Sequence, residues 1–146
     1  MLPPSMARYY VDEAAFDLPD IGLVDRTATR LEAFSPEGDE LALRVNRARL
    51  PAGKTLSDLV NENVRNAEIN LRAHKVLFRR DVEIAGHPAV EIASEWRGNQ
   101  GMIYTRQAHL AVDGTWIVFS GNVPLAERAA CDQVVEHATA TFRVRD

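Results

Sequence analysis

The chain has 146 residues, of which 46% are hydrophobic and 26% are charged. This composition is typical of a soluble globular protein and excludes a disordered one. Seventeen basic residues against 21 acidic residues give a net charge of −4, so the chain lacks the basic excess of a nucleic-acid-binding protein.

The single cysteine, Cys131, excludes an internal disulfide and fits a reducing compartment. No apolar run approaches the roughly 18 residues that a membrane span requires. The N-terminal stretch MLPPSMARYY does not have the basic and then apolar pattern of a signal peptide, and we interpret residues 1–6 as a disordered extension. Residues 7–146 contain no linker, which predicts one domain. We therefore expect a cytoplasmic protein that does not insert into a membrane.

The first half of the chain predicts a β-hairpin followed by a helix. Residues 23–34 and 41–49 have the alternating pattern of paired strands. Apolar residues then recur at helical spacing over residues 56–72, and Thr55 with Asp58 resembles a capping box. Asparagine is a mediocre helix former, yet this helix carries four of them: Asn61, Asn63, Asn66 and Asn70.

The second half predicts four strands and a second helix. The strands are expected at residues 75–84, 88–96, 102–112 and 115–120. Asp113-Gly114 suits a two-residue type I′ turn between the last two strands. A helix beginning at Pro124 would place these residues along one side: Leu125, Cys131, Val134, Val135, Ala138 and Phe142. The order of elements predicts an α+β fold, with two long helices packed on an antiparallel sheet.

The strand register predicts two unlike faces. The Asp113-Gly114 turn pairs Gln107 with Ser120, and a count across residues 97–101 pairs Glu91 with Gln107. One face is then apolar. The other is mixed and holds Ala89, Glu91, Ala93, Glu95, Ile103, Thr105, Gln107, His109, Trp116, Val118 and Ser120. This mixed face is either a partly solvated surface or a shallow groove that receives an apolar partner, and the pattern alone leaves both interpretations open.

The sequence lacks the usual signatures of catalysis. It has no nucleotide-binding loop, no nucleophile elbow and no zinc-protease motif. Its four histidines lie on different elements without metal-ligand spacing. Glu91 and Glu95 are about 13 Å apart along a strand, which is too far for a retaining carboxylate pair. Cys131 reads as a small core residue. We therefore expect no enzyme activity, no cofactor and no metal.

Three segments carry a resemblance to a known family: ALRVNRARLPAGKTLSDLVNENVRNAEINL, VEIAGHPAVEIASEWR and IYTRQAHL. They resemble the DcrB-related proteins, and among these the Eag chaperones of type VI secretion effectors. The resemblance extends from about Ala7 to Asp146. Its most telling motifs are Val45-Asn46-Arg47, Thr55-Leu56, Gly86 with Pro88-Ala89, and Arg106-Gln107.

The resemblance implies a PsbP-like α/β/α sandwich and a symmetric homodimer. It implies a non-enzymatic chaperone or adaptor that binds and shields the N-terminal transmembrane helices of PAAR-containing effectors and aids their loading. Two glutamines of that family contact the bound helices, and they correspond here to Gln107 and Asn63. The implied groove comprises Asn63, Gln107, Ala28, Ile103, Thr105, His109, Trp116 and Val118. Arg30 departs from the aliphatic residues that line the groove in the family.

The sequence is compatible with two other functions. One is a DcrB-like envelope-associated protein, although the sequence shows neither a signal peptide nor a lipidation cysteine. The other is a small-ligand-binding module that uses the mixed face as a pocket. A deep pocket with convergent titratable groups would favour the module, whereas an open groove across a dimer would favour the chaperone.

Overall fold

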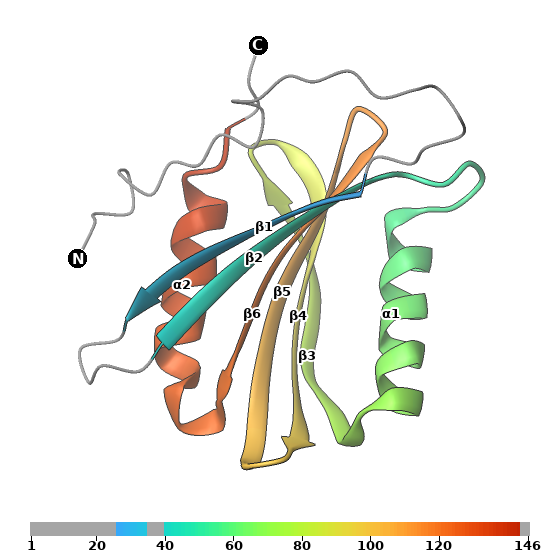
Figure 1. Cartoon of the computed structure of the whole chain (residues 1–146). Helices are drawn as coiled ribbons and strands as arrows, with labels where there is room; N and C mark the ends of the chain where they lie inside the picture. The colour runs from blue at the N-terminus through green and yellow to red at the C-terminus, as the bar shows by residue number, and fades with distance from the viewer. Residues whose placement is uncertain (1–25, 35–39, 144–146) are drawn as a thin grey trace, which may run out of the picture.

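The computed structural model describes residues 26–34 and 40–143. They form a six-stranded antiparallel sheet in the order β1-β2-β6-β5-β4-β3, with one helix against each face (Figure 1). The predicted α+β architecture is confirmed. The predicted N-terminal extension, residues 1–6, lies outside the described residues.

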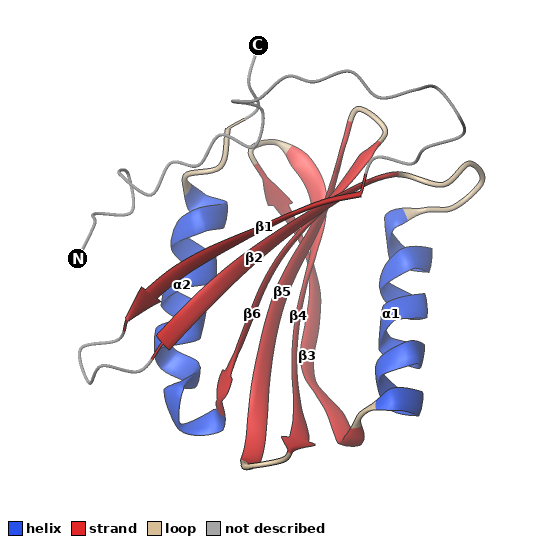
Figure 2. Ribbon diagram, in the orientation of Figure 1, coloured by secondary structure: helices blue, strands red, loops and turns tan. Residues whose placement is uncertain are grey.

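The elements follow the expected order along the chain (Figure 2). The strands are β1 (Arg26–Phe34), β2 (Glu40–Arg49), β3 (Arg72–Ile84), β4 (His87–Gly98), β5 (Gly101–Val112) and β6 (Thr115–Pro124). The helices are α1 (Leu56–Asn70) and α2 (Arg128–Ala140), with a short 3-10 turn, η1 (Leu125–Glu127), before α2. Within the described residues, the predicted boundaries differ from these by at most a few residues.

Helix α1 begins at the predicted capping box. The Thr55 N–H donates to the Asp58 carboxylate at 2.9 Å, and the Asp58 N–H donates to the Thr55 hydroxyl at 3.1 Å. The bond from the Thr55 backbone is the main cause that lowers the pKa of Asp58. The helix packs on β3, β4 and β5, where its buried Val60 meets Val90 and Ile92 of β4. This contact fixes which side of the sheet α1 covers.

Helix α2 covers the opposite side of the sheet, where it packs on β6, β5 and β2. Its buried Cys131 and Val135 join the larger core cluster. The other predicted helix residues pack against the same cluster: Leu125, Val134, Ala138 and Phe142. Cys131 is 3% exposed within this cluster, so the interpretation of this cysteine as a core residue is confirmed. This burial raises the pKa of its thiol to about 11.

The β5–β6 hairpin has the predicted register. Asp113 has φ 48° and Gly114 has φ 80°, and positive φ at both central residues defines a type I′ turn. Gln107 therefore lies opposite Ser120, as the turn chemistry predicts.

The β4–β5 register was predicted wrongly by one residue. Gly98 pairs with Gly101, so the loop between the strands has two residues, whereas the predicted count assumed an odd number. Ile92, and not Glu91, lies opposite Gln107. A shift of one residue moves a whole strand to the other face. The mixed face therefore loses Ala89, Glu91, Ala93 and Glu95 to the α2 side and gains Val90, Ile92, Ser94 and Trp96.

Candidate functional site

The strongest candidate site lies on the side of β5 and β6 that faces α1. This α1-side face consists of Ile103, Thr105, Gln107, His109, Ala111, Trp116, Val118, Ser120 and Asn122. Within these two strands, no side chain on this face is an acid, a lysine or an arginine. The face therefore mixes polar and apolar side chains and carries no permanent charge. Its histidine, His109, is the one side chain of this set that could become protonated.

The predicted groove residues divide by exposure. Ile103, Thr105, Gln107 and Trp116 are partly exposed. His109 and Val118 have 0% and 7% of their surface accessible, so they lie beneath the surface and support it from below.

His109 links two of the partly exposed side chains. The Trp116 indole Nε1–H donates to His109 Nδ1 at 3.2 Å, and His109 Nε2 lies 2.9 Å from Gln107 Oε1. The Trp116 and His109 ring planes are nearly parallel, with 18° between them. Burial, with a smaller contribution from the charge of Arg79, lowers the pKa of His109 to about 4. The imidazole is therefore neutral at pH 7.

A second polar chain runs across the same face. The Trp96 indole N–H donates to the Thr105 hydroxyl at 3.0 Å, and that hydroxyl donates to the Asn122 side-chain oxygen. Three strands, β4, β5 and β6, are thus tied together by side chains as well as by the backbone ladder. The two polar chains hold this face in a defined arrangement.

The asparagines of α1 make different contacts. Arg79 of β3 donates to the Asn61 side chain and to the Ser57 hydroxyl, which ties the helix to the sheet edge. Asn70 donates to the Asn66 carbonyl. Asn63 is partly exposed on a helix that packs over β5, so it lies on the same side of the sheet as Gln107.

The remaining predicted residue, Ala28, lies in β1 opposite Asn46 of β2, and Asn46 in turn lies opposite Val118 of β6. Arg30 lies opposite Arg44. The backbone of β1 places both Ala28 and Arg30 in the ladder next to β2.

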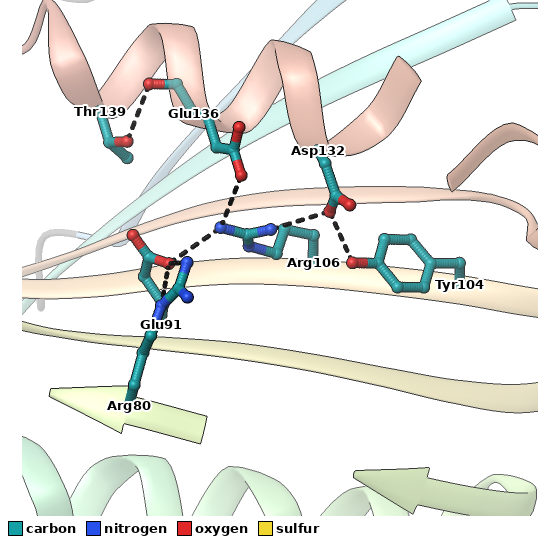
Figure 3. A network of polar contacts seen from close by, with 7 residues as sticks. All are labelled: Arg80, Glu91, Tyr104, Arg106, Asp132, Glu136 and Thr139. Carbon is teal, nitrogen blue, oxygen red and sulfur yellow. Dashed lines mark hydrogen bonds and ion pairs between the residues drawn. The ribbon is translucent and has the colours of Figure 1, made fainter. Parts of the chain in front are cut away.

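The other side of the sheet holds a charged network that the sequence analysis missed (Figure 3). Arg106 of β5 is 2% exposed. Its guanidinium donates to Asp132 at 2.8 Å, to Glu91 at 2.8 Å and to Glu136 at 3.4 Å. It also lies 5.0 Å from the centre of the Phe78 ring. A buried arginine within an apolar strand pattern was the available signal, because such a charge needs partners.

Two further side chains complete this Arg106 network. The Tyr104 hydroxyl donates to Asp132, and burial together with that carboxylate raises the pKa of Tyr104 to about 12. Arg80, with 55% of its side chain exposed, pairs with Glu91 at 2.7 Å. Arginines or tyrosine thus pair with each of these carboxylates. The network acts as a clamp, because its contacts fasten α2 to the sheet.

The described parts of the chain offer little other chemistry. Over residues 26–34 and 40–143, no three metal-ligating side chains gather at one place. Neither α1 nor α2 has the length and hydropathy that crossing a membrane demands.

Comparisons with known proteins bear on the family and the fold of this chain. A family model described as DcrB matches residues 13–141. A search of curated proteins finds no match. PA94 from Pseudomonas aeruginosa, a protein of unknown function, has a similar structure with a TM-score of 0.80 and 22% identity, covering 94% of this chain and 96% of that one.

Two more distant structures share the fold. LpqN, which is involved in cell envelope biogenesis of Mycobacterium tuberculosis, has a TM-score of 0.57 and 9% identity, covering 70% of this chain and 61% of its own. CyanoP, the cyanobacterial PsbP from Synechocystis, has a TM-score of 0.54 and 13% identity, covering 89% of this chain and 98% of its own. The fold is therefore PsbP-like, as expected.

Proposed function

This chain belongs to the DcrB family, and within that family we propose that it is a non-enzymatic chaperone or adaptor. Its partners are the N-terminal transmembrane helices of PAAR-containing type VI secretion effectors, which it binds and shields in the cytoplasm before the effector is loaded. The observation that carries the proposal is the uncharged, partly exposed α1-side face around Gln107.

A transmembrane helix makes particular demands on a receptor in water. Its backbone hydrogen bonds are satisfied within the helix, and its apolar side chains need cover. A receptor face must therefore offer neutral contact area, because a charged group would lose hydration without gaining a partner. Ile103, Ala111 and Trp116 supply apolar area on the α1-side face, and all three are partly exposed.

The arrangement of the helices leaves room for such a partner. Helix α1 packs mainly on β3, β4 and β5, and α2 packs on the opposite side of the sheet. Among the described helices, neither packs chiefly on β2 and β6 from the α1 side. A partner helix placed there would meet Ala48, which lies opposite Trp116 and is partly exposed, and would pass the exposed Arg44 opposite Ser120. Small side chains allow helices to approach closely.

Co-purification tests the proposal. The chain is co-expressed with the N-terminal apolar segment of an effector encoded beside it, as wild type, as Ala111→Glu and as Ala129→Glu. Ala111 lies on the α1-side face, whereas Ala129 is exposed on α2. We expect the wild type and Ala129→Glu to retain the segment and Ala111→Glu to lose it. Equal retention by all three variants would contradict the proposed face.

The proposal includes a homodimer, which would bring two α1-side faces to one effector. A sheet face that leaves apolar side chains partly exposed is a frequent site of protein–protein contact. Light scattering should give about twice the chain mass of 16.3 kDa. A mass near that of one chain at micromolar concentration would contradict the dimer.

The alternative is an envelope-associated DcrB-like protein. The observation that favours it is the structural likeness to LpqN, a protein involved in cell envelope biogenesis. Cell fractionation separates the two. The chaperone is expected in the cytoplasmic fraction with its effector, whereas the alternative requires the chain to remain with the envelope in the absence of any effector.

A further inference from the structure

The hydrogen-bonding chain of Trp116, His109 and Gln107 has only one consistent direction. An indole Nε1–H can donate and cannot accept. Because Trp116 Nε1 lies 3.2 Å from His109 Nδ1, that ring nitrogen must be the acceptor and carries no proton.

The next link follows from the state of the imidazole. His109 is fully buried, and its low pKa keeps it neutral at pH 7. A neutral imidazole has one N–H and one acceptor nitrogen. With Nδ1 accepting from Trp116, the proton resides on Nε2. The Nε2–H therefore donates to the atom 2.9 Å away, which is the side-chain oxygen of Gln107.

This donation settles the orientation of the Gln107 amide. If the amide were flipped, its NH₂ group would face the Nε2–H, and two donors would oppose each other. With the oxygen turned inward, the NH₂ group is the end left for other contacts. Gln107 is partly exposed, and within the described residues this NH₂ group has no hydrogen-bond partner.

We infer that Trp116 and His109 are positioning residues that fix Gln107 as a hydrogen-bond donor, so that the α1-side face selects a partner presenting a neutral acceptor. The occupant is an apolar helix, and the acceptor is one of its main-chain carbonyl oxygens. This inference rests on the proposed function and names the chemistry by which the same face would recognise its partner.

A carbonyl acceptor fits the surroundings of Gln107. Each backbone carbonyl has two lone pairs, and the last four carbonyls of a helix have no partner within the helix. An anionic acceptor fits less well, because on this side of the sheet the cationic side chains of Arg44 and Arg79 lie two strands away from Gln107. Arg79, the charge that acts on His109, is already engaged by Asn61 and Ser57.

The first test measures the direction of the chain in the wild-type protein. Nitrogen NMR of histidine-labelled protein at pH 7 distinguishes the two neutral tautomers of His109. We expect the proton on Nε2 in the wild type. In Trp116→Phe, where the indole donor is lost, we expect a mixture of tautomers. A proton on Nδ1 in the wild type would overturn the inference without bearing on the chaperone function.

The second test measures the donor itself. The probe is a synthetic helix of about 20 leucine, alanine and glycine residues with lysines at both ends, held in mild detergent. Gln107→Glu keeps an acceptor for His109 Nε2–H but has no donor, and we expect it to weaken binding about tenfold, in keeping with one lost hydrogen bond to a buried partner. The matched control is Asn46→Asp, which adds the same charge on β2 beside Val118.

The outcomes separate the two claims. Weaker binding by Gln107→Glu than by Asn46→Asp supports the donor role. Equal binding by the two variants would overturn it, because charge alone would then explain the effect. If the wild type fails to bind the probe, the apolar-helix occupant and the proposed function both fail, whereas the tautomer measurement still decides the direction of the chain.

Discussion

The two sides of the sheet differ in the polar residue at their centre and in how that residue is paired. On the α2 side, Arg106 is a charged residue enclosed by carboxylates from β4 and α2. On the α1 side, its neighbour Gln107 is a neutral residue that shares one end with buried His109 and keeps the other end open. Consecutive residues of one strand point to opposite faces, so Arg106-Gln107 serves both sides at once.

The charge of the residue on each side explains why one face is closed and the other is available. A buried charge must be paired, because an unpaired one costs several kcal/mol in free energy. Once Arg106 is paired with Asp132 and Glu91, the α2 side is held shut. A neutral amide carries no such requirement, so Gln107 can sit half-exposed with unused donors at modest cost. The α1 side is therefore the one suited to a partner.

Removing Arg106 should have the largest effect on stability. Arg106→Met leaves Glu91 and Asp132 without their buried cation, and we expect the free energy of unfolding to fall by about 3–5 kcal/mol. The matched control is Arg80→Met, which removes the exposed arginine from the same Glu91 and should cost about 1 kcal/mol or less. Urea unfolding of both variants checks this, and similar losses would contradict the clamp.

Lowering the pH should act on the α1 side through His109. Its pKa is about 4 when folded and 6.5 when unfolded, so the unfolded state binds the proton more readily. Stability is therefore full above pH 6.5 and falls as the pH drops towards 4, by about 2 kcal/mol between pH 7 and pH 5. The difference between wild type and His109→Asn in urea unfolding isolates this residue, and parallel pH profiles would refute the assignment.

Changing the β5–β6 turn should lower the stability of the whole sheet. Gly114 has φ 80°, and a Cβ added there would meet no atom within 4 Å. Gly114→Val should therefore cost about 1–2 kcal/mol through backbone strain alone. Gly114→Asn is the matched control, since asparagine tolerates this conformation, and it should retain most of the stability in thermal unfolding. A valine variant as stable as wild type would mean that the turn is not type I′.

The smallest effect is expected for Gln107→Glu. Gln107→Glu retains an oxygen for His109 Nε2–H, so the free energy of unfolding at pH 7 should change by about 0.5 kcal/mol or less. Gln107→Ala removes that oxygen, leaves the buried His109 donor unpaired and should cost about 1–3 kcal/mol. Equal losses in urea unfolding would show that His109 does not depend on the Gln107 oxygen.

Local chemistry made much of the fold predictable. The capping box at Thr55, the helical spacing of α2 and the Asp113-Gly114 turn each depend on residues close in sequence, and each is confirmed. The turn also predicted the β5–β6 register, which places Gln107 and Trp116 on the same face of the sheet.

The predictions that failed, or were never made, concerned contacts between residues far apart in the sequence and a loop of ambiguous length. The two-residue loop between Gly98 and Gly101 lacks the residue pair that marks a type I′ turn, so its length could not be counted, and β4 was assigned to the wrong face. The Arg106 network joins residues up to 30 positions apart, which no local pattern reveals. The burial of His109 likewise follows from packing that the strand alternation alone does not specify.

Photo-crosslinking tests the central claim most directly, because it asks which face the effector segment touches. Benzoylphenylalanine replaces either Arg44 or Gln133, both of which are exposed. Arg44 lies opposite Ser120 in the β2–β6 ladder, on the α1 side, whereas Gln133 lies on α2. Irradiation of the co-purified complex should crosslink the apolar segment from position 44 and not from position 133. Crosslinking from position 133 alone would place the partner on the other side of the molecule and contradict the account.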